Sequence, residues 1–152
     1  MSEKSVKATV EIEAPPEEVW ELVMDPQRLE EWVTIHRGLG KVSDRPLKDG
    51  STLEQTLCLR GINFHVRWKV AEAKAPELAI WEGKGPARSR TRTEYHLTEN
   101  GNGGTRFDYE NAFKPPLGPL GAAAGRALVG GVSKREANKT LKQLKELAER
   151  GN

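Results

Sequence analysis

The chain has 152 residues, of which 36% are hydrophobic and 30% are charged. This length predicts a single domain over residues 1–152 that can bury a sizeable core. The formal net charge of +2 argues against non-specific nucleic-acid binding, so nucleic acid is an unlikely partner.

The first elements expected along the chain are a strand and two short helices. Residues 6–12 alternate between apolar and polar side chains, as in a half-buried strand. The segment 14–18, Ala-Pro-Pro-Glu-Glu, places prolines and glutamates where the first turn of a helix accepts them. Because a residue before proline avoids helical geometry, Asp25-Pro26 predicts the end of this helix. A second short helix is expected over residues 27–32.

A run of about six strands is expected next, separated by short turns. The strongest turn signal is the segment 100–104, Asn-Gly-Asn-Gly-Gly. Strands joined by short turns are antiparallel, and one apolar and one charged face per strand indicate a sheet with one wet side. The strands are expected over residues 37–43, 51–60, 64–70, 78–83, 89–97 and 105–113.

The last third of the chain predicts one long helix with two unlike halves. Residues 137–148 carry Ala and Leu at helical spacing and can fill a core, whereas Pro115–Gly131 offers mostly alanine and glycine. A glycine pair at 130–131 favours a bend. If a sheet faces both halves, the first half leaves room beside it, and such room favours a ligand cavity with a mobile mouth.

The uncharged run 115–125 is too short and too rich in glycine and proline to span a membrane. The first residues are polar, without the apolar region of a secretion signal. The single Cys58 permits no internal disulfide. A cytoplasmic protein is therefore expected.

Two segments resemble a known family: residues 14–26 followed by Leu-Glu-Glu-Trp at 29–32, and the tail 135–148 with Thr-Leu-Lys-Gln-Leu-Lys at 140–145. The pattern is similar to the START-like, Bet v 1-like (SRPBCC) superfamily, and within it to the polyketide cyclase/dehydrase and lipid-transport family. The resemblance implies an α+β helix-grip fold, in which a curved antiparallel sheet of about seven strands wraps around a long C-terminal helix. It also implies an apolar cavity between them. Members include enzymes, carriers and regulators, so the fold alone does not choose a function.

The inner face of the expected sheet mixes apolar with polar side chains. Buried polar groups need hydrogen-bond partners, or each costs about 1–3 kcal/mol. Several on one face suggest an internal network or a lined cavity, although a plain core is an alternative, above all for Val66 and Phe107. Trp32 either contacts a ligand or anchors the helix pair. The residues predicted to contact a ligand are Trp32, Gln55, Leu57, Phe64, Val66, Trp68, Trp81, Thr91, Thr93, Tyr95, Phe107, Tyr109, Asn111, Phe113, Leu117, Leu120 and Leu128.

No catalytic residue, metal or cofactor is predicted. His36, His65 and His96 lack metal-ligand spacing, and only His36, after Trp32, lies where it could reach a cavity entrance as an acid or base. Cys58 has the outer-face parity of its strand and is expected to be inert.

The sequence therefore predicts a monomer or homodimer that binds a small hydrophobic or amphipathic ligand, such as a lipid or polyketide. One alternative is a cyclase/dehydratase in which tyrosine hydroxyls assist the reaction. Another is a module that contacts RNA, a membrane or another macromolecule through a basic outer face. That face consists of Arg67, Lys69, Arg88, Arg90 and Arg92, although Asp108 and Glu110 on the adjacent strand are expected to pair with these arginines.

Overall fold

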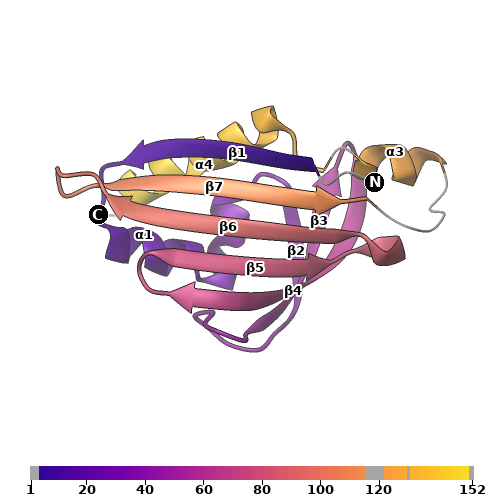
Figure 1. The fold of residues 1–152 in the computed structure, drawn as a ribbon, viewed down its shortest axis with the longest axis horizontal. Coiled ribbons are helices and arrows are strands. Elements are labelled where there is room, and N and C mark those ends of the chain that lie inside the picture. Colours follow the sequence, from indigo (N-terminus) through magenta and orange to yellow (C-terminus); the bar gives the residue numbers. More distant parts are fainter. Residues whose placement is uncertain (1–3, 116–121, 130, 151–152) are drawn as a thin grey trace.

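One curved antiparallel sheet forms the body of the molecule (Figure 1). The computed structural model describes residues 4–115, 122–129 and 131–150. Within these ranges the sheet has seven strands in the order β1-β7-β6-β5-β4-β3-β2, so β1 and β2 lie at opposite edges. The strands are β1 (Lys4–Ile12), β2 (His36–Val42), β3 (Thr52–Leu59), β4 (Ile62–Lys74), β5 (Leu78–Lys84), β6 (Arg90–Glu99) and β7 (Thr105–Lys114).

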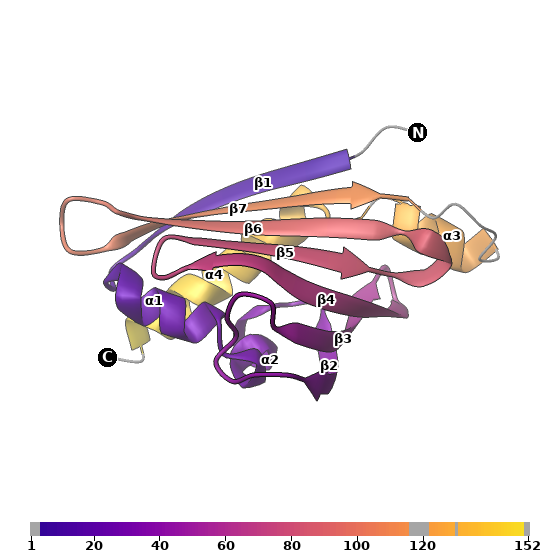
Figure 2. The ribbon, with the colours of Figure 1, turned by 60° about the horizontal axis from the view of Figure 1, so that its bottom comes forward.

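The helices α1 (Pro16–Val23), α2 (Leu29–Trp32) and α4 (Lys134–Arg150) lie on one side of this sheet (Figure 2). The remaining helices are the 3-10 helices η1 (Pro26–Arg28) and η2 (Pro86–Arg88) and the short helix α3 (Ala122–Val129). The long helix α4 packs against β1 and α2. The helix-grip fold predicted from the sequence is thus confirmed. No helix in the described ranges is long and apolar enough to cross a membrane.

The N-terminal helices begin and end where the prolines predict. Pro16 occupies the first turn of α1, and Glu17 and Glu18 lie at its positive end. The Asp25 side chain then accepts a hydrogen bond from the Gln27 backbone N–H at 3.1 Å, which caps η1. These short elements deliver Trp32 to the inner face of the sheet.

An aromatic cluster joins the helices to the sheet. The ring of Trp32 lies edge-on to Tyr95 at 5.9 Å and to Phe107 at 6.5 Å between centroids. On the other side, α4 buries Leu141 and Leu144, in the helical period expected from the sequence. This core fixes one end of the space between sheet and helices.

The C-terminal region differs from the single long helix expected. The segment with small residues forms a separate helix, α3, and the chain turns before α4 at Gly131, with φ of +59°. A Cβ at Gly131 would lie 3.2 Å from Cβ of Phe113, so both the backbone angle and the close approach require glycine. Helix α3 lies at the same end of the sheet as η2 (Figures 1 and 2).

Candidate ligand-binding cavity

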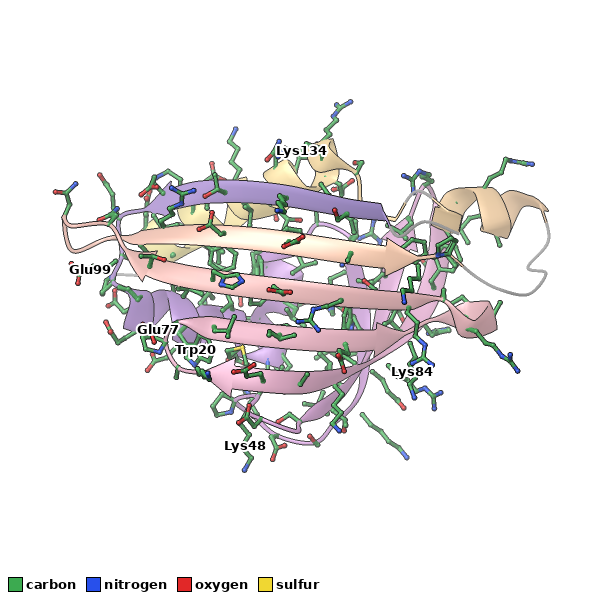
Figure 3. All side chains as sticks on the ribbon, in the orientation of Figure 1. Trp20, Lys48, Glu77, Lys84, Glu99 and Lys134 are labelled. Carbon is green, nitrogen blue, oxygen red and sulfur yellow. The ribbon has the colours of Figure 1, made fainter. Side chains whose placement is uncertain are left out.

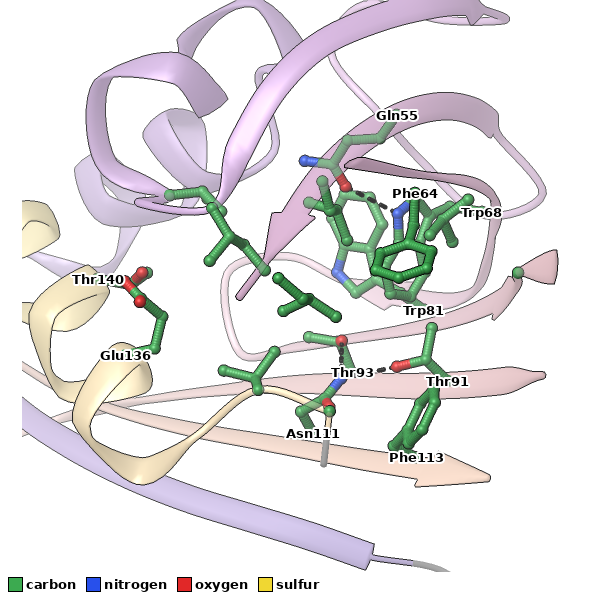
Figure 4. A pocket seen from close by; sticks show the side chains of 18 of the residues that line it. Gln55, Phe64, Trp68, Trp81, Thr91, Thr93, Asn111, Phe113, Glu136 and Thr140 are labelled. Carbon is green, nitrogen blue, oxygen red and sulfur yellow. Dashed lines mark hydrogen bonds between the residues drawn. The ribbon is translucent and has the colours of Figure 1, made fainter. Parts of the chain in front are cut away.

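A mostly apolar cavity lies between the inner face of the sheet and the helices (Figure 4). About 110 Å³ of it is open to the centre of a water molecule. Strands β3 to β7 form its wall, and α2, η2, α3 and α4 contribute its remaining sides. The lining includes most of the residues predicted from the sequence, namely Trp32, Gln55, Leu57, Phe64, Val66, Trp68, Trp81, Thr91, Thr93, Tyr95, Tyr109, Asn111, Phe113 and Leu128.

Three predicted residues are not in this lining. Phe107 is fully buried beneath Trp32 and Tyr95, so its prediction as a contact residue is corrected to a core role. Its strand alternation placed it correctly on the inner face, but Trp32 lies over it. Leu117 and Leu120 lie outside the described residues.

The side-chain amide of Gln55 links Trp68 in the cavity wall to His36, which lies outside the lining. Trp68 Nε1 donates to Gln55 Oε1 at 2.8 Å (Figure 4). Gln55 Nε2 in turn lies 2.8 Å from Nδ1 of His36. Since the amide nitrogen is a donor, Nδ1 of His36 must accept, which requires a neutral imidazole. Burial accordingly lowers the pKa of His36, with the positive charge of Arg37 acting in the same direction and Glu30 opposing it.

A second amide organises the sheet wall. The hairpin of β6 and β7 places Thr93 directly opposite Asn111. Asn111 Nδ2 donates to the hydroxyl oxygens of Thr91 at 2.8 Å and of Thr93 at 3.0 Å (Figure 4). Both amide protons are thereby used, and each threonine keeps its own hydroxyl proton for another acceptor.

Two tyrosines stand next to each other on the same wall. Tyr95 and Tyr109 are paired across β6 and β7, with ring centroids 6.4 Å apart. Burial raises the pKa of both phenols, and the neighbouring Tyr109 adds to the effect on Tyr95. Both groups therefore stay protonated at neutral pH. Within the described part of the chain, neither hydroxyl has a hydrogen-bond partner, so both remain available as donors.

Two indole N–H groups beside the cavity are also unpaired. Nε1 of Trp32 and Nε1 of Trp81 are buried and have no hydrogen-bond partner among the described residues. An unpaired buried donor costs about 1–3 kcal/mol, so each such group in a folded protein calls for an explanation such as a bound molecule.

A carboxylate enters the cavity lining from α4. Ser133 caps the helix by accepting the backbone N–H of Glu136 at 3.1 Å. The Glu136 carboxylate accepts the hydroxyl proton of Thr34, whose oxygen lies 2.9 Å from that of Thr140. The chain from Thr140 through Thr34 to Glu136 ties the segment after α2 to α4.

One glycine controls how deep the wall lies. Gly83 on β5 pairs with Trp68 on one side and Thr91 on the other. A Cβ at this position would lie 2.8 Å from the Trp68 ring and 2.7 Å from Thr91 Cγ2. The Trp68 ring therefore lies over Gly83, in space that the side chain of any other residue at position 83 would fill.

The sequence pattern of the polyketide cyclase/dehydrase and lipid transport family matches residues 3–149. The chain belongs to this family. Membership and fold together support a protein of the ligand-binding or polyketide-cyclase type within the SRPBCC superfamily.

Relatives of this chain match most of its length. Uncharacterized protein Rv1546 of Mycobacterium tuberculosis is 30% identical over 146 residues, which are 94% of this chain and 97% of the relative. Toxin Rv0910 of the same organism is 25% identical over 124 residues, or 81% and 86% of the two chains. The Zhui aromatase/cyclase from Streptomyces sp. R1128 superposes with a TM-score of 0.79 over 98% of this chain and 95% of its own. At 15% identity, this last likeness shows the fold alone.

Sequence reasoning missed part of the lining. Glu136 precedes Thr140 by four residues, one helical turn, so the helical period could have placed both on one face. The lining around η2 was also missed: Gly85 and Pro86 were expected only as a turn, and Ser89 and Arg90 as the start of the following strand. Further unpredicted lining residues are Leu29, Val33, Ile35, Leu53, Leu59, Gly131, Val132 and Ala137.

The remaining candidate residues lie away from the cavity. His65 is exposed and lies 3.0 Å from the Thr56 hydroxyl, and His96 lies 3.0 Å from Glu94. His36 is not in the cavity lining, and its side chain is linked to the lining through Gln55. Among the described residues, no group of three or more His, Cys, Asp or Glu residues is placed to hold a metal ion.

The ion pairs predicted between the basic face and Asp108 or Glu110 are not found among the described residues, and Arg92 pairs with Glu82 and Glu94 instead. Asp108 pairs instead with Arg106 on its own strand, at 3.2 Å. Glu110 lies opposite Glu94, because the register of β6 and β7 sets Arg92 against Ala112. The acidic residues of β7 therefore leave the arginines of β6 without the partners predicted for them.

Proposed function

We propose that this protein binds a small hydrophobic or amphipathic molecule in the cavity. The observation that carries the proposal is the combination of aromatic walls with unpaired donors, above all the hydroxyls of Tyr95 and Tyr109. An apolar pocket with a few convergent polar groups is the usual form of a small-molecule site. The apolar walls would hold the body of the ligand, and the tyrosine and threonine hydroxyls would orient an oxygen atom on it.

The volume limits what the cavity holds in its present shape. About 110 Å³ is well below the roughly 300–1,000 Å³ of pockets for drug-sized ligands. A lipid or polyketide would therefore require the cavity to widen. Helix α3 is the element best suited to move, because it contacts a small cluster that includes Phe64 and Phe113 and is separated from α4 by Gly131.

Native mass spectrometry of the purified protein tests for a co-purified small molecule. Binding is then measured with Nile red, a neutral fluorescent probe. Val132→Phe adds a ring at the lining of a cavity of only about 110 Å³, so the ring occupies space that the probe needs. We expect affinity to fall about tenfold or more, which corresponds to about 1.4 kcal/mol. Ala112→Phe adds the same ring on the outer face of the sheet and is the matched control. Equal Nile red affinity in the wild type and both variants would contradict binding in this cavity.

A cyclase or dehydratase is the second candidate function. The observation that favours it is the presence of hydrogen-bond donors and a carboxylate around one cavity, namely Tyr95, Tyr109 and Glu136. Protonated phenols can stabilise a developing enolate, and a carboxylate can accept a proton. The double substitution Tyr95→Phe/Tyr109→Phe separates the two functions. Retained binding of a linear polyketide surrogate with lost turnover would support catalysis, and absence of turnover by the wild type would oppose it.

A further inference from the structure

Four cations lie directly opposite one another across four strands of the outer sheet face. The register pairs Arg67 with Lys84, Lys84 with Arg90, and Arg90 with Lys114. All four side chains are exposed. Since neighbouring strands are about 4.8 Å apart, this cationic row spans roughly 14 Å. Lys84 marks its position in Figure 3, at the end of the sheet opposite Glu77 and Glu99.

The described part of the chain does not pair the cationic row with carboxylates. None of its four members forms an ion pair within the described ranges, whereas the next arginine along β6, Arg92, pairs with both Glu82 and Glu94. Glu54 on β3 lies opposite Arg67, but the two form no ion pair, because the Glu54 carboxylate is turned toward the backbone N–H of Lys41, whose hydrogen bond it accepts at 3.2 Å. Glu54 leaves a single negative charge beside four positive ones. Like charges placed directly opposite in a sheet are destabilising. The row thus carries a cost within the protein that an external anion would relieve.

The cationic row borders the cavity and an exposed apolar group. Arg90 belongs to the row and also lies in the cavity lining beside η2. Arg67 and Lys84 line a surface groove together with Leu39 and Ile62. Leu39, 37% exposed, is the most exposed large hydrophobic side chain of the described residues. Charge and apolar surface therefore meet at the end of the sheet where η2 lines the cavity.

We propose that this end of the sheet docks on an anionic lipid surface. Lipid headgroups attract clustered lysines and arginines, and the acyl boundary accepts an apolar side chain such as Leu39. A single-stranded nucleic acid is less well matched, because its proteins stack bases on aromatic side chains and the cationic row has none. Docking would set the cavity beside the membrane, but the proposal does not depend on a cavity ligand.

The test is co-sedimentation with vesicles of phosphatidylcholine containing 30% phosphatidylglycerol, compared with phosphatidylcholine alone. We expect binding only to the anionic vesicles, weakening as salt rises. Arg67→Gln/Lys84→Gln removes two cations that do not line the cavity. Each cation near an anionic surface contributes about 1 kcal/mol, so the partition coefficient should fall about thirty-fold.

Matched variants make the outcome decisive. Lys74→Gln/Arg106→Gln changes the net charge equally at two exposed, ion-paired sites outside the row and is expected to change vesicle binding much less. The charge-conserving Arg67→Lys/Lys84→Arg variant should bind like the wild type, which controls for folding. The proposal is overturned if anionic vesicles are not bound, if both neutralised variants lose binding equally, or if polyuridylate RNA binds more tightly in the same buffer.

Discussion

Replacing Gln55 with leucine tests whether the amide bridge supports the cavity wall. Leucine is similar in size to glutamine, so the change removes two hydrogen bonds without opening a large void. The indole N–H of Trp68, now donating at 2.8 Å to Gln55, would be left buried and unpaired. His36 is only half-buried, and water can replace the lost partner there.

The expected loss follows from the indole alone. An orphaned buried donor costs about 1–3 kcal/mol, so we expect the free energy of unfolding to fall by about 2 kcal/mol. For a chain of this size, 1 kcal/mol corresponds to about 2–4 °C in Tm, which predicts a decrease of about 4–8 °C. Urea unfolding followed by far-ultraviolet circular dichroism measures the effect without relying on the tryptophans.

A double-mutant cycle identifies the hydrogen bond as the cause. Trp68→Phe leaves the oxygen of Gln55 unpaired, whereas the double variant removes both partners together. Replacing both partners by apolar groups is far less costly, so the double variant should be more stable than the sum of the single losses predicts, by at least 1 kcal/mol. Additivity within about 0.5 kcal/mol would refute the reasoning.

Three further predictions concern the turn before α4, His36 and α3. Gly131→Ala should lower the free energy of unfolding by about 1–2 kcal/mol, because Gly131 has a φ of +59°. Gly125 lies in α3 with open space around its Cβ position, so Gly125→Ala should raise the free energy of unfolding by up to about 1 kcal/mol. The denaturant midpoints of the two variants measure both effects. Burial lowers the pKa of His36 below its ordinary value of 6.5, so the folded state binds this proton less readily than the unfolded state does. The neutral imidazole therefore contributes to the free energy of unfolding above pH 6.5, and this contribution is lost as the pH falls through the lowered pKa. His36→Asn should therefore flatten the pH dependence of stability between pH 7 and 5, and an unchanged slope would contradict this. Arg60 donates hydrogen bonds to the Ala127 and Gly131 carbonyls at 2.7 and 3.0 Å and so holds the end of α3 in place. Arg60→Gln should therefore increase local opening of α3 and the rate of chymotrypsin cleavage after Leu128. Equal cleavage rates in the variant and the wild type would contradict this prediction.

Much of the fold could be predicted from the spacing of apolar residues, because that spacing marks which face of each strand or helix is buried. Alternation along residues 105–113 placed Tyr109 and Asn111 on the inner face, and the loop 100–104 fixes their register against β6. Counting back from that loop also sets Arg92 opposite Ala112. The sequence therefore indicates that Asp108 and Glu110 do not stand directly opposite the arginines of β6.

Other features depend on tertiary contacts that no local pattern contains. Two glycines at 130–131 are compatible with a bend or with a full break, and the close approach of Phe113 to Gly131 decides between them. Glu136 has the spacing of a capping-box residue, which predicts that its side chain folds back to the helix start. Only the position of Thr34 after α2, far away in sequence, explains why the carboxylate turns toward the cavity instead.

Gly83 allows the shape of the cavity to change independently of the residues that line it. Trp68 and Thr91 line the cavity, whereas Gly83, which lies between them in the sheet, does not. The positions of the Trp68 ring and of Thr91 nevertheless depend on the lack of a side chain at Gly83. A methyl group there would collide with the indole and with Thr91, so the wall would have to shift and the shape of the cavity would change without a substitution at any lining residue. In relatives with the same lining, ligand length could thus diverge through a position that comparisons of contact residues would overlook.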